Sequence, residues 1–161
     1  MVQSGHAVEA ADNAAPAMTL VFRAGSCLCA LRLDDVIETM RPSAVRPLTG
    51  MPGYVRGVTV MRGVPTPVLD VAHLLGEAHT EIVRFVAVRT ERGPAAFATG
   101  EVLGIRTAGT HVADPPPGAL LGPAGTLVAG VSRLNDQPLL LVQCMRVLPD
   151  EVWAAAAGGR R

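Results

Sequence analysis

The sequence contains no lysine, because all fourteen basic residues among its 161 are arginine. This absence excludes the lysine of a phosphate-binding loop, a Schiff-base lysine and the catalytic lysine of a protein kinase, since each of those functions needs an amine. Arginine favours bidentate pairing with carboxylates. The chain is therefore better equipped for contacts with other proteins than for chemistry on a substrate.

Aromatic residues are also scarce, at 3% of a chain that is 49% hydrophobic. We therefore expect an aliphatic core built from valine, leucine and alanine. Fourteen acidic residues balance the fourteen arginines, so the net charge is +0 and the electrostatic drive for nucleic-acid binding is missing. A nucleic-acid-binding barrel, the first alternative, would need a basic face and stacking aromatics.

The sequence has no run of eighteen apolar residues, and the stretch through Ala17 lacks the basic start and apolar region of a signal peptide. We therefore expect a cytoplasmic protein. The three cysteines are an odd number, so a disulfide framework is not expected. Cys27 and Cys29 face the same side of a predicted strand, and we interpret them as small core residues rather than as a metal or redox pair.

Residues suited to catalysis do not occur in a catalytic pattern. The four histidines lie far apart in the sequence, at His6, His73, His79 and His111. Ser132 follows Gly130-Val131 but lacks the second glycine of a nucleophile elbow. We therefore predict no enzyme activity, no metal and no cofactor. A ligand-binding or hydrolytic barrel, the second alternative, would need convergent polar groups in a cavity, which the sequence does not display.

Short apolar runs separated by turn residues recur along the chain, and almost no segment has a long helical period. The predicted strands are 18–24, 27–33, 36–40, 55–61, 64–69, 82–89, 95–101 with its continuation 102–107, 126–134 and 138–143. Residues 36–40 are alternatively a short helical step. About nine such strands favour an all-β barrel or sandwich.

Three details of these segments can be tested. Alternation predicts that strand 27–33 is antiparallel and half-buried, with Cys27, Cys29, Leu31 and Leu33 on one face and Arg32 on the other. Asp70 is predicted to be the N-cap of a helical turn over residues 71–75, and residues 150–157 a terminal helix. Residues 113–125 contain four prolines and are predicted to be a loop, because missing amide donors would break a central strand.

The stretch 51–76 organises the rest of the chain. Its two β-type runs, 55–61 and 64–69, are joined by Arg62-Gly63, which predicts a hairpin with an arginine at its corner. Gly63 would permit a tight turn or a close approach of another backbone. Arg62 could be positioned by the two strands and still reach a carboxylate.

This stretch carries a motif in which a proline leads into Gly-Val-x-x-x-Arg-Gly, followed by an apolar strand with a proline and a closing aspartate. The matching residues are Pro52, Gly57-Val58-Thr59-Val60-Met61-Arg62-Gly63, Pro67 and Asp70, with Leu20-Val21-Phe22 and Val36-Ile37-Glu38 upstream. In these residues the chain resembles the CheW family of chemotaxis coupling proteins.

The resemblance implies two packed five-stranded SH3-like β-barrels that share a core, with short helical turns and a C-terminal helix. It places the first strand near the C-terminal lobe. The implied organisation is a flexible arm over residues 1–17, a CheW-like domain of two intertwined lobes over 18–150, and a short helix with a frayed tail over 151–161.

The resemblance also implies a non-catalytic adaptor that binds the regulatory domain of a CheA-type histidine kinase and the cytoplasmic tip of a chemoreceptor. Such a protein would be cytoplasmic and recruited to membrane receptor arrays. The implied partner-binding residues are Val36, Glu38, Gly57, Val58, Val60, Arg62 and Gly63. Exposed barrel edges could also accept a partner's strand.

Two interpretations of Arg62 and Glu38 remain open from the sequence. They form either a surface ion pair between neighbouring strands, or a clamp in which Glu38 holds the guanidinium so that Arg62 presents a fixed donor face to a partner. The wider alternative is a divergent regulator of a non-flagellar, surface-motility pathway that keeps only one partner surface. Weak self-association is also left open.

Overall fold

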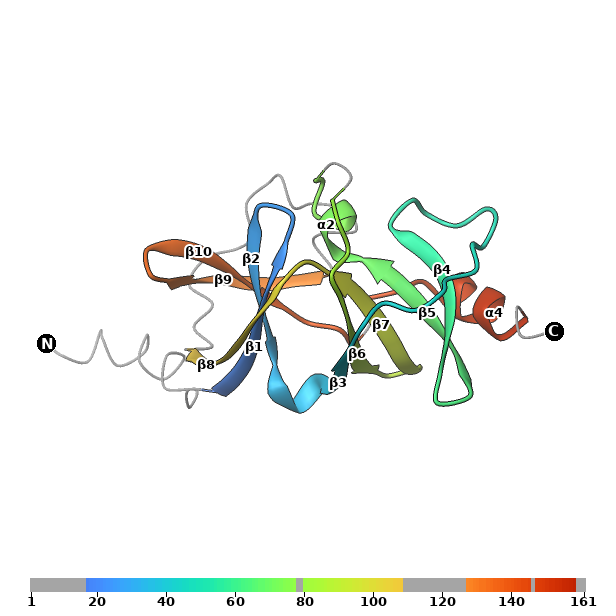
Figure 1. Cartoon of the computed structure of the whole chain (residues 1–161), viewed down its shortest axis with the longest axis horizontal. Helices are drawn as coiled ribbons and strands as arrows, with labels where there is room; N and C mark the ends of the chain where they lie inside the picture. The colour runs from blue at the N-terminus through green and yellow to red at the C-terminus, as the bar shows by residue number, and fades with distance from the viewer. Residues whose placement is uncertain (1–16, 78–79, 109–126, 146, 159–161) are drawn as a thin grey trace, which may run out of the picture.

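The computed structural model describes residues 17–77, 80–108, 127–145 and 147–158. In these residues the strands form two groups that lie side by side, with the last helix next to the second group (Figure 1). The predicted arm apart from Ala17, the predicted loop 113–125 and residues 159–161 of the predicted tail lie outside the described residues, whereas Gly158, also predicted to fray, ends the last helix.

The described strands form two five-stranded sheets, which confirms the predicted all-β class. Sheet A has the order β8-β1-β2-β10-β9 and sheet B the order β3-β6-β7-β5-β4. Sheet A consists of β1 (Ala17–Ala24), β2 (Cys27–Arg32), β8 (Val102–Ala108), β9 (Val128–Leu134) and β10 (Gln137–Val142). Sheet B consists of β3 (Val36–Met40), β4 (Val55–Met61), β5 (Val64–Asp70), β6 (Arg84–Thr90) and β7 (Gly93–Thr99). The helical segments are η1 (Leu33–Asp35), α2 (Val71–Leu74) and α4 (Asp150–Gly158).

The two sheets have the same layout. Each has a hairpin of two strands, β1–β2 or β6–β7, whose second strand pairs in parallel with a strand of another hairpin, β9–β10 or β4–β5. The strand that follows each first hairpin then crosses to the other sheet: β3 pairs with β6, and β8 pairs with β1. The two lobes thus exchange one strand each, and the first strand lies in the same sheet as the last two, as the resemblance implied.

Buried side chains form one shared core and a smaller core within each sheet. The shared core takes residues from both sheets, including Phe22 of β1, Leu31 of β2, Leu69 of β5 and Phe97 of β7. Sheet B has its own cluster around Phe85. All three phenylalanines of the chain are therefore buried among valine, leucine and alanine, so the core is mostly but not wholly aliphatic.

The prediction that strand 27–33 is half-buried was wrong. Leu28, Cys29, Ala30 and Leu31 are all buried, and β2 ends at Arg32. The reason is position, because β2 lies between β1 and β10, and its two faces contribute to different cores. In β10, Leu139 and Val142 are buried, whereas residues 140–141 are half-buried.

The prediction that residues 102–107 continue the strand before them was also wrong. The chain leaves sheet B after Thr99, and β8 joins sheet A. Gly100 makes this crossing beside β1: its N–H donates to the carbonyl of Arg23 at 2.8 Å, and the N–H of Arg23 donates to the carbonyl of Glu101 at 2.9 Å. A Cβ on Gly100 would lie 3.1 Å from that Arg23 oxygen, so a small residue suits the position.

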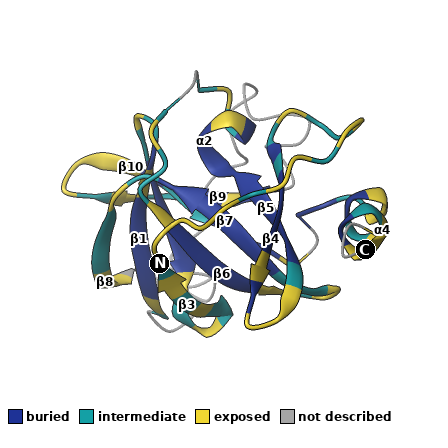
Figure 2. Ribbon diagram, turned by 45° about the vertical axis from the view of Figure 1, so that its right-hand side comes forward, coloured by how far each residue is buried: buried dark blue, intermediate teal, exposed yellow. Residues whose placement is uncertain are grey.

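The short helices anchor the ends of strands. Asp70 caps α2 as predicted, because its Oδ1 accepts the N–H of His73 at 3.1 Å. At the other end of the chain, α4 buries Val152 and Ala156 while its other residues stay exposed or half-exposed (Figure 2). Within the described residues, no helix has the length and hydropathy needed to cross a bilayer.

Candidate functional site

The β4–β5 hairpin turns at Arg62 and Gly63, as the sequence predicts. Their φ angles are +52° and +78°, which is the backbone geometry of a two-residue type I′ turn. A left-handed conformation costs glycine little but is uncommon for arginine. The turn therefore fixes the point at which the Arg62 side chain leaves the backbone.

Arg62 is held by Glu38 of β3 through two hydrogen bonds. Its Nε donates to Oε2 at 2.7 Å, and its Nη2 donates to Oε1 at 3.0 Å. The side chain of Arg62 is 77% exposed and that of Glu38 28% exposed. Among the described residues, Nη1 has no acceptor, so this end of the guanidinium points to solvent with its donors available.

Electrostatics around this pair follow from the same geometry. The hydrogen bonds from Arg62 lower the pKa of the Glu38 carboxyl, and the charge of the arginine acts in the same direction. Because the pKa is lowered, the ion pair persists as the pH falls below the ordinary carboxyl value, and it is lost only below the lowered one. At neutral pH the pair is fully charged.

The pair does not join neighbouring strands, which corrects the first interpretation from the sequence. β3 and β4 are the two opposite edges of sheet B, so the contact draws the two edges together. The chain after β3 does the same, because Arg46 and Val58 exchange two backbone hydrogen bonds of 2.8 Å each. Sheet B is thereby closed toward a barrel, and Arg62 marks one end of the closure.

Gly57 permits that closure. Its φ is +137°, and a Cβ there would lie 2.1 Å from the carbonyl oxygen of Arg46. The register between β4 and β5 also shifts between Val55 and Gly57, so Arg56 is the extra residue of a β-bulge. The connecting segment can approach β4 this closely only because position 57 carries no side chain.

The predicted partner-binding residues separate into two groups. Val58, Val60 and Gly63 line one groove of about 530 Å³ beside the outer edge of β4. Of these, Val60 is 65% exposed, whereas Val58 is 4% exposed and contributes to the interior. Val36 lies elsewhere, at the start of β3, where it is half-buried against the shared core.

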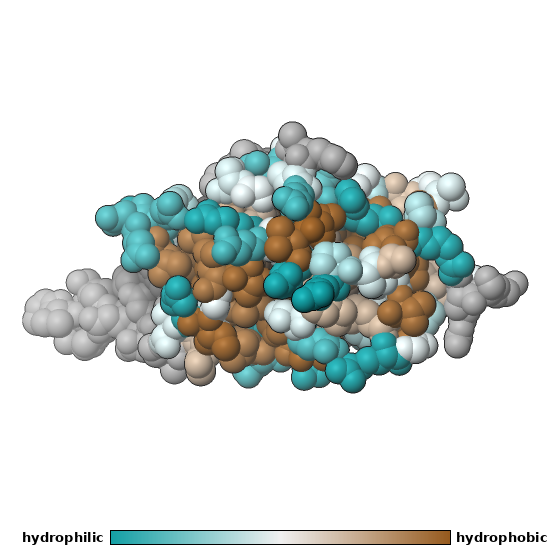
Figure 3. Space-filling model, in the orientation of Figure 1, coloured by the Kyte–Doolittle hydropathy of each residue, from teal (hydrophilic) through white to brown (hydrophobic). Residues whose placement is uncertain are grey.

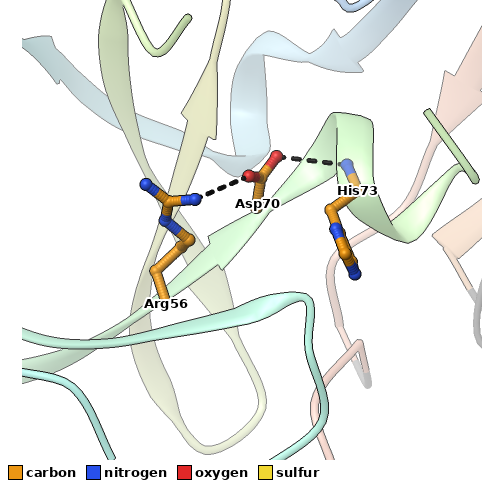
Figure 4. Close-up of polar contacts among 3 residues, drawn as sticks. All are labelled: Arg56, Asp70 and His73. Carbon is orange, nitrogen blue, oxygen red and sulfur yellow. Dashed lines mark hydrogen bonds and ion pairs between the residues drawn. The ribbon is translucent and has the colours of Figure 1, made fainter. Parts of the chain in front are cut away.

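A second polar cluster lies at the far end of the same hairpin. Asp70 is 4% exposed, and its Oδ2 accepts from Nη1 of Arg56 at 3.4 Å while Oδ1 caps α2 (Figure 4). The ring of His73 lies against Gly53, where an added Cβ would be 2.9 Å from Nε2. The cap was predicted from the sequence, but the contact with Arg56 was not, because a bulge that redirects a side chain leaves no local signal.

The described cysteines and histidines do not form a metal-binding cluster, although Cys27 Sγ lies 4.0 Å from Oε2 of Glu77. Within the described parts of the chain, no three side chains of His, Cys, Asp and Glu come close enough to hold a metal ion. Cys29 and Cys144 are buried, and Cys27 is half-buried. Burial raises the pKa of the Cys144 thiol to about 12, and the charge of Asp35 adds to this effect. These thiols are packed as core residues.

Exposed apolar side chains lie beside the Arg62–Glu38 pair. Ile37 is 39% exposed, Val60 65% and Val64 45%. In the space-filling view, brown apolar areas over both sheets alternate with teal polar ones (Figure 3). A charged pair with aliphatic neighbours is typical of a protein-binding surface, where a few apolar anchors are surrounded by polar contacts.

Comparisons with known proteins agree with this architecture. A family model described as CheW-like domain matches residues 19–152. Protein FrzA of Myxococcus xanthus is 33% identical over 101 residues, which are 60% of this chain and 62% of FrzA. The chain thus spans less than two thirds of that relative. The crystal structure of scaffolding protein TtCheW from Thermoanaerobacter tengcongensis superposes with a TM-score of 0.70 at 19% identity, over 82% of this chain and 92% of that one.

Proposed function

Because the chain belongs to the CheW-like domain family, we propose that it is a non-catalytic adaptor that couples chemoreceptors to a CheA-type histidine kinase. It acts in the cytoplasm and is recruited to receptor arrays. The regulatory domain of the kinase binds the surface of sheet B around Arg62, and the cytoplasmic tip of the receptor binds between the two lobes. A small change in the receptor then biases the kinase through differences in contact free energy between two states.

The observation that carries this proposal is the geometry of Arg62. Two of its nitrogens are fixed by Glu38 and a third is directed to solvent, so the guanidinium is oriented before a partner arrives. A preorganised side chain loses less conformational entropy on binding than a free one. An exposed ion pair by itself contributes little to stability, so stability gives little reason for this arrangement.

The surrounding surface fits the same role. Val60 and Val64 flank the turn that carries Arg62, and Ile37 precedes Glu38 in β3. These side chains supply aliphatic contact area next to a directed charge. A partner with an apolar patch beside a carboxylate would match the surface in shape and in charge.

Binding of purified variants to the kinase regulatory domain and to a receptor cytoplasmic fragment tests the proposal. We expect Arg62→Asp to keep its circular dichroism spectrum and its melting temperature while its affinity for the kinase domain falls at least tenfold. The matched control is Arg92→Asp, because Arg92, in the turn between β6 and β7, also forms an exposed ion pair, with Asp150 of α4. Undiminished kinase binding by Arg62→Asp would remove this residue from the site.

A charge swap separates the two interpretations of the pair. The double variant Glu38→Arg with Arg62→Glu restores an ion pair between β3 and the turn but presents a carboxylate to the partner. If the pair served only the fold, the double variant would bind like the wild type. We expect it to remain defective in kinase binding. If the wild-type protein bound the kinase domain but not the receptor fragment, the result would instead favour a divergent regulator that keeps one partner surface.

A further inference from the structure

The outer edge of β4 is open at one residue. In β4, the N–H and the carbonyl of Val58 both bond to Arg46, so they point away from β5, and Val58 with its partner Pro67 is a pair without hydrogen bonds. Hydrogen-bonded and non-hydrogen-bonded pairs alternate in an antiparallel ladder. Val60 with its partner Pro65 is therefore the next such pair, and the backbone N–H and carbonyl of Val60 also point outward.

Proline at 65 and 67 agrees with this alternation, because neither position supplies an amide hydrogen to β4. At Val60, two residues after Val58, no described segment covers the outer edge of β4. Among the described residues, the outward N–H and carbonyl of Val60 have no partner. One donor and one acceptor, spaced as a β-ladder requires, are thus left open beside an exposed valine.

These two groups face the groove defined above, which is lined by Ala44, Val45, Arg46, Val58, Thr59, Val60, Gly63 and Pro65. The hydroxyl of Thr59 is already bonded to the carbonyl of Ala44 at 2.8 Å and to the hydroxyl of Ser43 at 2.7 Å. Among the described residues, the outward backbone groups of Val60 and the guanidinium of Arg46 have no partner. Arg46 is exposed, and its side chain has no acidic partner among the described residues.

We propose that this groove binds an extended segment of another protein, which pairs by its backbone with Val60 and places a carboxylate on Arg46. Aliphatic side chains at alternate positions of the segment would lie on the valine-lined walls. The charge of Arg46 selects an acidic residue, because an unpaired cation beside an open strand edge favours a complementary carboxylate. The groove shares Val60 with the surface proposed above for the kinase, but neither Glu38 nor the guanidinium of Arg62 takes part, so Arg62→Asp should leave peptide binding unchanged while it weakens kinase binding.

A second copy of this chain does not fit as the occupant. In a two-fold antiparallel pairing of β4 edges centred on Val60, the partner's residue 62 would oppose Val58. That place on the edge is already taken by Arg46, and the pairing would also bring arginines of the two copies together. A segment can pair with the open edge at Val60 only if it does not extend along β4 to Val58, where Arg46 is already bonded.

The test uses the full-length chain and a synthetic peptide, acetylated and amidated, of alternating valine and threonine with one glutamate near an end. Amide NMR spectra should show a saturable shift centred on Val60, and hydrogen exchange at that amide should slow on addition of peptide. A peptide N-methylated at alternate positions loses its donors and should not bind. Equal binding of the methylated peptide, or no saturable change at Val60 up to millimolar peptide, would overturn the proposal.

Variants then locate the carboxylate. Arg46→Gln should weaken the glutamate peptide roughly three- to tenfold, and should leave a glutamine peptide of the same sequence unaffected. Arg41→Gln is the matched control, because Arg41 is exposed on the same connecting segment but outside the groove. Both variants should fold like the wild type, since neither side chain has a polar partner among the described residues. An equal loss with the glutamine peptide would exclude a carboxylate contact at Arg46.

Discussion

Replacing Gly57 by alanine adds one methyl group at the place where the segment after β3 closes against β4. The methyl group would lie 2.1 Å from the carbonyl oxygen of Arg46, 2.7 Å from its carbonyl carbon and 2.9 Å from Cα of Pro47. All three contacts are with backbone, so no side chain can rotate out of the way. The segment that carries Arg46 has to move off the edge of β4, and the two hydrogen bonds between Arg46 and Val58 are lost.

The expected magnitude has two parts. A non-glycine residue at a φ of +137° costs on the order of 1–3 kcal/mol in backbone strain. Losing two backbone hydrogen bonds of ordinary strength adds about 1–3 kcal/mol. For a domain of this size, each kcal/mol lowers the melting temperature by roughly 2–4 °C. Loss of the two hydrogen bonds to Arg46 should therefore by itself lower the melting temperature by several degrees.

Gly93 provides the control for backbone strain. Its φ is +125°, close to that of Gly57, but nothing lies within 4 Å of the position of an added Cβ. Urea unfolding of Gly57→Ala and Gly93→Ala should thus show similar strain costs, with a further loss of about 2 kcal/mol for Gly57→Ala alone. Hydrogen exchange at the amides of Arg46 and Val58 should accelerate only in Gly57→Ala. Equal stabilities, or unchanged exchange at Arg46, would refute the account of closure.

Two further predictions concern stability. Because the sequence has no lysine, the groups that titrate above about pH 9 are mainly the three thiols and Tyr54. Burial is the main cause of the raised pKa of each of these groups. A raised pKa in the folded state means that the unfolded chain loses these protons first, so stability should fall as the pH rises from about 9 toward 12. Urea unfolding midpoints at about pH 8 and about pH 10.5 measure this loss of stability, and the loss should be smaller in Cys144→Ala. A midpoint that does not change with pH would contradict the prediction. Separately, Asp70→Ala removes the cap of α2 and the partner of Arg56, and should cost about 1–2 kcal/mol or more in thermal unfolding, whereas Glu81→Ala, at an exposed position, should cost little.

Local features of the fold could be predicted from the sequence because their signals are local. The Arg62-Gly63 turn follows from the two apolar runs on either side of it, and the cap at Asp70 follows from its place before a short apolar turn. The contact between Glu38 and Arg62 was part of both interpretations that the sequence left open. Its role in binding a partner stays a prediction.

Other features depend on contacts between segments that are distant in the sequence. The half-buried pattern expected for β2 failed because a parallel neighbour, β10, arrives more than a hundred residues later in the chain. The bulge at Arg56 and the closure over Gly57 depend on where residues 41–46 run, and no periodicity encodes that path. Glycine at 57 was visible, but the sequence alone could not tell a turn, a bulge and a close approach apart.

The exchange of β3 and β8 between the lobes bears directly on how an adaptor of this kind can transmit a signal. The chain passes from β2 to β3 through three residues, Leu33–Asp35, and from β7 to β8 through Gly100 and Glu101. Both crossings are short, and the shared core lies between the sheets. Separating the lobes would require unpairing both β3 from β6 and β8 from β1. We therefore expect a displacement at Glu38 to reach sheet A through β3 and η1.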